Sequence, residues 1–301
     1  MNTRLISHEF EYHAPQTLQK ALELLSRYGP EAKILAGGTD LVGHLKFGKR
    51  TPAHVIDIKK LAELKSISKG TVIKIGAGNN FKTVQDCFAG SIVYAGLYES
   101  IYSIGKTQVL NMATVGGNLA NGSPKADTAP PLLTYDARIK LVSLNGERTL
   151  DLKEFHTGPN KTVMADNEVL TEIEFDALPS HTSSAFEKTA RVGADISKIT
   201  CAVTVARAGS VCKSCRIACG AAAPVPMRTP LAEEMMIDKT VDEELIDTVA
   251  LQVGKEIKPP AGGRPSQAYR RQMVAGMFRG GGGRGWGGAG GGGGWGTGGG
   301  A

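Results

Sequence analysis

Apolar and polar positions alternate along the first sixty residues in a way that predicts a small α/β unit. Residues 14–29 place leucines and an alanine on one face, with a proline near the start and a glycine past the end, which predicts an amphipathic helix. The apolar runs at 32–36 and 54–58 read as buried strands, and a helical pattern begins between them at Leu41. Strands that alternate with helices favour parallel pairing.

The pattern then changes to one typical of antiparallel strands. Residues 64–78 predict a hairpin that turns at Lys69 and Gly70. We expect this part to complete a first domain at residues 1–178, with lobes of about 1–60 and 61–178. The pattern predicts helices over 80–90 and 92–105 and strands over 137–144, 147–152 and 168–175.

A polar break at residues 178–184 separates a second domain, which we expect over residues 182–279. Its pattern predicts three antiparallel strands backed by helices, so the whole chain is expected to be α+β. The strand candidates are 184–190, 197–207 and 215–223, and the helix candidates are 229–236, 241–257 and 266–278.

Composition adds a glycine-rich tail at residues 280–301, which holds the two tryptophans of the chain. Such a segment cannot bury a core, so we expect it to be flexible. A linker or a processing scar is the preferred interpretation, and a loose interaction tail is the alternative.

Charge and cysteine content narrow the class of protein. The net charge is +6, but no block of basic residues follows the pattern of nucleic-acid binding, so we expect no nucleic-acid partner. No apolar run approaches the ~20 residues of a membrane span, and the start lacks the apolar core of a secretory signal. The cysteines number five, an odd count that favours a reducing cytoplasm over a disulfide framework.

Two glycine pairs stand where an apolar or β-branched residue gives way to a helical pattern, at Gly37-Gly38 and at Gly116-Gly117. Helix N-termini present unpaired N–H groups that bind phosphate, and glycine allows close approach to the backbone. We expect Thr39 or Asp40 to cap the first helix. Each pair alone could be a tight turn, whereas both together favour a site for one diphosphate-containing cofactor. Neither pair is a GxGxxG fingerprint.

These residues make the chain resemble the FAD-binding (medium) subunits of the molybdenum hydroxylases, a family that includes carbon monoxide, nicotinate, xanthine and aldehyde dehydrogenases. The resemblance runs in order from Phe10 to Arg279. It implies a two-lobed FAD domain of the vanillyl-alcohol-oxidase (PCMH) type, followed by a small α+β domain with a three-stranded sheet. The matching stretches are AGGTDLVGHLK, QVLNMATVGGNLANGSPKADTAPPLL, EVLTEIEF, AFEKTARVGADISKITCAV, GAAAPVPMRTPLAEE and AYRRQM.

The same resemblance implies which residues hold FAD. It assigns the diphosphate to the two glycine corners and the flavin ring to residues scattered later in the chain. From the residues alone, Asp127 is either a helix cap or a ligand contact. The implied set is Ile34, Leu35, Ala36, Gly37, Gly38, Thr39, Asp40, Leu41, Ile104, Thr114, Val115, Gly116, Gly117, Asn118, Asp127, Leu170, Lys188 and Ile196.

Electron transfer is the function that the resemblance implies. A partner subunit with two [2Fe–2S] clusters would supply electrons, a molybdopterin-containing large subunit would oxidise the substrate, and the assembly would be a dimer of heterotrimers. Lys188 would stabilise negative charge on reduced FAD, unless it is an ordinary surface lysine. NAD, quinone, oxygen and ferredoxin all stay open as the electron acceptor, and no catalytic residue is expected in this chain.

Two other functions compete with this interpretation. One is a freestanding FAD-dependent oxidoreductase with its own substrate pocket, and the other is a binding module that has lost FAD. The cysteines Cys212, Cys215 and Cys219 have cluster-like spacing, but a tetrahedral zinc or a [4Fe–4S] cluster normally needs four ligands. We therefore expect them to be buried small hydrophobes and expect no metal site.

Overall fold

The first lobe of the molecule is a small parallel sheet covered by one helix. A computed structural model describes residues 6, 8–261 and 265–286. The sheet has the order β1-β3-β2 and is parallel throughout, which confirms the predicted pairing. Strands β1 (Glu11–His13), β2 (Ala32–Leu35) and β3 (His54–Asp57) form it, with α1 (Leu18–Tyr28) packed on β3.

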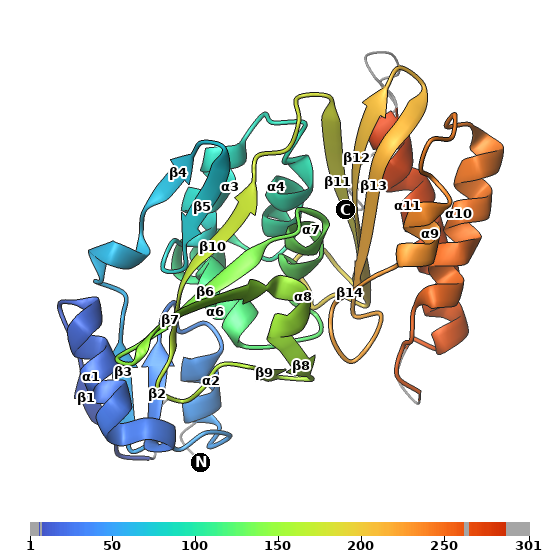
Figure 1. The fold of residues 1–301 in the computed structure, drawn as a ribbon. Coiled ribbons are helices and arrows are strands. Elements are labelled where there is room, and N and C mark those ends of the chain that lie inside the picture. Colours follow the sequence, from blue (N-terminus) through green and yellow to red (C-terminus); the bar gives the residue numbers. More distant parts are fainter. Residues whose placement is uncertain (1–5, 7, 262–264, 287–301) are drawn as a thin grey trace.

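The second lobe is built on a five-stranded antiparallel sheet with the order β4-β5-β10-β6-β7 (Figure 1). Its central strand, β10, pairs with β5 and β6 through buried residues such as Ile173. The strands are β4 (Ile67–Lys69), β5 (Val72–Gly76), β6 (Arg138–Ser143), β7 (Gly146–Asp151) and β10 (Val169–Asp176).

Short helices cover this sheet and carry the connections that line the cavity described below. The predicted helices at 80–90 and 92–105 are confirmed as α3 and α4, and the helical pattern that begins at Leu41 is confirmed as α2. The remaining helices are too short for a clear periodic signal. The helices of the second lobe are α3 (Phe81–Phe88), α4 (Ala95–Tyr102), α5 (Thr107–Met112), α6 (Val115–Ala120), α7 (Ala129–Thr134) and α8 (Leu152–Phe155), with a small β8 (His156–Gly158) and β9 (Lys161–Thr162) pair. Helix α2 (Leu41–Lys46) follows β2 in the first lobe.

The C-terminal sheet has four strands rather than the three that we expected. The added strand, β14, pairs only with Ala218 and Cys219. Two residues are too few to produce a period-two pattern, so the sequence carried no signal for it. The strands are β11 (Thr182–Thr189), β12 (Ile199–Ala208), β13 (Val211–Gly220) and β14 (Met227–Arg228).

Helices lie on both faces of the C-terminal sheet. Helices α10 (Glu243–Glu256) and α11 (Gln267–Trp286) form its outer layer together with α9 (Pro230–Glu234) (Figure 1). Helices α4 and α7 of the second lobe pack against strands of the same sheet. Helix α11 includes residues 280–286 of the glycine-rich tail, which are therefore helical, and the remaining tail lies outside the described residues.

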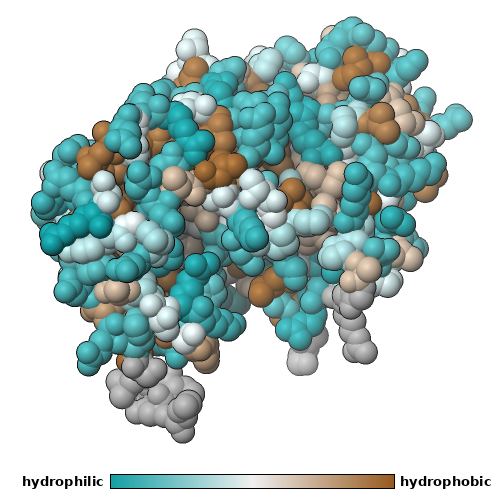
Figure 2. All heavy atoms as spheres, turned by 60° about the horizontal axis from the view of Figure 1, so that its bottom comes forward, coloured by the Kyte–Doolittle hydropathy of each residue, from teal (hydrophilic) through white to brown (hydrophobic). Residues whose placement is uncertain are grey.

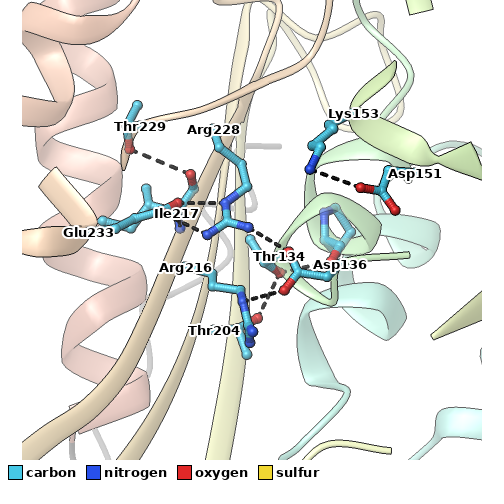
Figure 3. A network of polar contacts seen from close by, with 11 residues as sticks. Thr134, Asp136, Asp151, Lys153, Thr204, Arg216, Ile217, Arg228, Thr229 and Glu233 are labelled. Atoms are coloured by element: carbon cyan, nitrogen blue, oxygen red, sulfur yellow. Dashed lines mark hydrogen bonds and ion pairs between the residues drawn. The ribbon is translucent and has the colours of Figure 1, made fainter. Parts of the chain in front are cut away.

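A polar network joins the second lobe to the C-terminal domain (Figure 3). Asp136, which follows α7, accepts from Arg216 Nε at 2.7 Å and from Arg228 Nη1 at 2.5 Å. Beside it, the Thr134 and Thr204 hydroxyl groups are 2.7 Å apart. These contacts attach the C-terminal end of α7 to the sheet and link the second lobe to the C-terminal domain.

One face of the molecule is mostly hydrophilic (Figure 2). Figure 2 shows apolar side chains scattered in small groups among polar ones on this face. Among the residues that the structure describes, no helix is both long and apolar enough to cross a bilayer.

Candidate functional site

A cavity of about 820 Å³ lies where the two lobes and the C-terminal domain meet. Both glycine corners line it, together with residues of β11 and of the loop after it. This volume is near the upper end of the ~300–1,000 Å³ range of ligand pockets. Of the predicted site residues, the cavity is lined by Ile34, Ala36, Gly37, Gly38, Thr39, Asp40, Leu41, Ile104, Thr114, Gly116, Gly117, Asn118, Asp127, Leu170, Lys188 and Ile196.

Two predicted residues, Leu35 and Val115, are not among those that line the cavity. Ile34 and Ala36 reach the cavity, and Leu35 between them does not. Val115 is completely buried in the core of the second lobe.

The first corner needs glycine because the backbone of another segment lies against it. A Cβ atom on Gly37 would overlap Met112 O and would lie 2.7 Å from Ala113 Cα. Gly38 adopts a φ of +77°, which side chains rarely allow. The two glycines therefore bring the β2–α2 turn directly against the end of α5, just before the second corner.

Unpaired backbone donors gather at the first corner. Within the described part of the chain, no group accepts a hydrogen bond from the N–H groups of Gly37, Gly38, Thr39 or Asp40. Asp40 is at the N-cap position but makes no capping bond; its carboxylate accepts from Asn121 Nδ2 at 3.2 Å. The expected cap is absent, and the corner keeps donors for an anionic ligand.

The second corner differs, because its N–H groups are already used. Val115 N donates to Asn79 O at 3.1 Å and Gly116 N donates to Ala77 O at 3.0 Å. Thr114 caps α6 by accepting from Gly117 N at 3.1 Å. A Cβ on Gly116 would lie 2.5 Å from Ala77 Cβ. The expectation that both corners offer free donors is thus wrong for the second, which contributes close packing instead.

A buried ion pair lies at another part of the cavity wall. Lys188 Nζ donates to Asp127 Oδ2 at 2.7 Å and to Ser103 O at 2.9 Å, and Ser197 Oγ donates to Asp127 Oδ1 at 2.5 Å. The side chains of Lys188 and Asp127 are 8% and 7% exposed, which excludes an ordinary surface lysine. Burial raises the pKa of Asp127, and its bonds to Lys188 and Ser197 oppose that rise.

Asp127 does not cap α7, and its carboxylate lines the cavity while it is held by Lys188 and Ser197. Thr128 occupies the N-cap position of α7 and donates to Asn118 Oδ1 at 2.6 Å. This bond links α7 to the second corner. Because Thr128 directly follows Asp127, it also keeps the ion pair close to that corner.

Lys125 is a cavity residue that sequence reasoning missed. Burial lowers the pKa of its ammonium group, and the positive charges of Lys198 and Arg270 add to the effect. No carboxylate of the described residues lies within ion-pair distance of it. The available signal was a lysine two residues before Asp127, in the stretch SPKADT. Its positive charge favours binding of an anion at this part of the cavity wall.

The buried His156, which contacts the end of α6, should make the stability of the chain depend on pH. Burial lowers the pKa of His156 below 6.5, although its ring lies 3.0 Å from the Leu119 carbonyl oxygen. As the pH falls below 6.5, the unfolded chain takes up a proton that the folded chain rejects. The free energy of unfolding should then fall by up to about 1.4 kcal/mol per pH unit from this group.

Denaturant unfolding of the chain and of His156→Gln between pH 7.5 and 5.5 measures this effect. We expect a shallower pH dependence in the variant, and an equal slope in both proteins would contradict the assignment.

Comparison with known proteins agrees with this architecture. Residues 8–177 match the family model described as the FAD binding domain in molybdopterin dehydrogenase, and residues 184–281 match the CO dehydrogenase flavoprotein C-terminal domain. The xanthine dehydrogenase FAD-binding subunit of Escherichia coli O157:H7 is 33% identical over 89% of this chain and 93% of that subunit.

The carbon monoxide dehydrogenase medium chain of Hydrogenophaga pseudoflava is 32% identical over 91% of this chain and 96% of its own length. A solved structure of carbon monoxide dehydrogenase from the same organism, lacking the Mo-pyranopterin moiety, superposes with a TM-score of 0.87. At 31% identity it covers 94% of this chain and 99% of that chain.

Proposed function

This chain belongs to the family of FAD-binding medium subunits of the molybdenum hydroxylases, and we propose that it relays electrons through FAD between partner subunits and an external acceptor. The observation that carries the proposal is the single cavity lined by both glycine corners and by the Lys188–Asp127 pair. The partners would be a subunit with two [2Fe–2S] clusters and a molybdopterin-containing large subunit, as a dimer of heterotrimers.

The residues of the cavity fit FAD by their chemistry. The first corner offers unpaired N–H donors, and a diphosphate supplies the acceptors that they lack. Lys125 adds a positive charge to the same cavity, and no carboxylate of the described residues forms an ion pair with it. FAD, when bound, supplies a carrier that accepts electrons singly and releases two together.

The other wall residues would position the cofactor and exclude water. Ile104, Leu170 and Ile196 present apolar surface to the cavity, beside the polar Lys188–Asp127 pair. Since Asp127 balances the charge of Lys188, the pair offers a fixed dipole rather than a free cation. We infer that it orients the cofactor and moderates charge that develops on it, as preorganised groups do.

Native purification with cofactor analysis tests the proposal. We expect a yellow complex that contains iron and molybdenum, in which removal of FAD abolishes reduction of an external acceptor while the iron–sulfur centres can still be reduced. A yellow monomer that oxidises a substrate alone would support the alternative of a freestanding oxidoreductase. A colourless chain that rejects added FAD would overturn both.

A further inference from the structure

Three potential metal ligands meet on the sheet of the first lobe, away from the cavity. Glu11 and His13 are two residues apart on β1 and so point to the same face of the sheet. The adjacent parallel strand β3 pairs His54 directly with Glu11. None of the three residues lines the cavity described above.

The spacing of their ligand atoms matches a tetrahedral zinc site. His13 Nε2 and His54 Nδ1 are 3.2 Å apart, and Glu11 Oε2 lies 3.7 Å and 3.4 Å from these two atoms. Zinc bonds to nitrogen and oxygen of about 2.0–2.2 Å give tetrahedral edges of roughly 3.3–3.6 Å. The three atoms therefore already define one face of such a tetrahedron.

The surroundings hold the two imidazole rings in place and leave access from solvent. The Tyr28 ring, on α1, stacks on His54 with centroids 3.6 Å apart, and also stacks on His13 at 5.3 Å. The side chains of His13 and His54 are 19% and 13% exposed, whereas that of Glu11 is 70% exposed. An ion could enter on the carboxylate side with little rearrangement of the rings.

We propose that Glu11, His13 and His54 form a binding site for Zn²⁺ or a similar divalent transition metal, with solvent at the fourth position. Two imidazoles and one carboxylate are ligands that zinc commonly takes. Because β1 supplies two ligands and β3 the third, the ion ties the short edge strand to the sheet. The competing interpretation is an imidazole pair joined only by its own hydrogen bond.

Calorimetric titration of Zn²⁺ into the full chain tests the site, after chelator treatment, removal of any affinity tag and saturation with FAD. We expect one ion per chain, binding weakened by more than about tenfold in His13→Gln and in His54→Gln, and an increase in melting temperature with zinc. His181→Gln, at an exposed position outside the cluster, is the matched control and should bind as the parent does.

Glu11→Gln is a second test that avoids the packed rings, because Glu11 is largely exposed. It should weaken binding with no change in circular dichroism. Equal zinc binding by the parent and all of these variants, or no binding at micromolar concentrations, would overturn the proposal. Absorption bands of Co²⁺ substituted at the site provide an independent readout of tetrahedral coordination.

Discussion

Gly37→Ala should destabilise the chain by about 3 kcal/mol or more and weaken FAD binding by at least tenfold. The added Cβ would overlap the carbonyl oxygen of Met112 and crowd Ala113. These are backbone atoms, which cannot rotate away as a side chain can, so the two corners must separate. Denaturant unfolding of the FAD-free chain and fluorescence titration with FAD measure the two effects.

Gly43→Ala is the matched control, because it makes the same chemical change a few residues later. An added Cβ at Gly43 has no heavy atom within 4 Å, and the residue lies inside α2. Alanine is favoured over glycine in a helix by up to about 1 kcal/mol, so this variant should be as stable as the parent or more so. Similar behaviour of the two variants would refute the steric role of Gly37.

Lys188→Met should cost about 3–5 kcal/mol of stability at neutral pH, since it leaves Asp127 buried without its counter-charge. The stability lost by this replacement should be smaller at low pH. Without Lys188 the pKa of Asp127 rises further above 3.8, so the folded chain binds a proton that the unfolded chain lacks. The free energy of unfolding of the variant therefore increases as the pH falls through that window. Denaturant unfolding from pH 8 to pH 5 measures it.

The double variant Lys188→Met/Asp127→Asn separates charge from packing. Removing both charges should recover part of the stability that the lysine replacement alone loses, because no uncompensated charge remains. Asparagine can still accept from Ser197, whose hydroxyl now donates to Asp127. Additive losses in the double variant would show that Lys188 and Asp127 are not coupled.

Elements with a strong periodic signal were predictable from sequence, and short or polar ones were not. The apolar runs at β2 and β3 and the amphipathic face of α1 predicted the parallel lobe correctly. Strand β1 reads Glu-Tyr-His, so its place at the sheet edge comes from pairing with β3 rather than from apolar alternation. Cluster-like spacing makes the cysteines visible as candidate metal ligands, whereas no sequence motif marks the histidines that this pairing brings together.

The cavity was predictable where backbone geometry demands a particular residue type. Gly37 and Gly38 carry a visible signal because only glycine permits that turn and that close approach. Lys188 and Asp127, by contrast, are far apart in sequence, and only tertiary packing shows that they neutralise each other. Which N–H groups stay unpaired was equally hidden, since it depends on acceptors such as Ala77 O.

The C-terminal sheet gives the two sequence domains a shared interior. Ala218, on β13, belongs to the same apolar cluster as the centre of the second lobe, and α4 and α7 cover that face of the sheet. Cutting the chain between the domains would thus expose Ala218 and the polar partners of α4 and α7, such as Thr204, to water. We therefore expect each half to be less stable alone than it is within the whole chain.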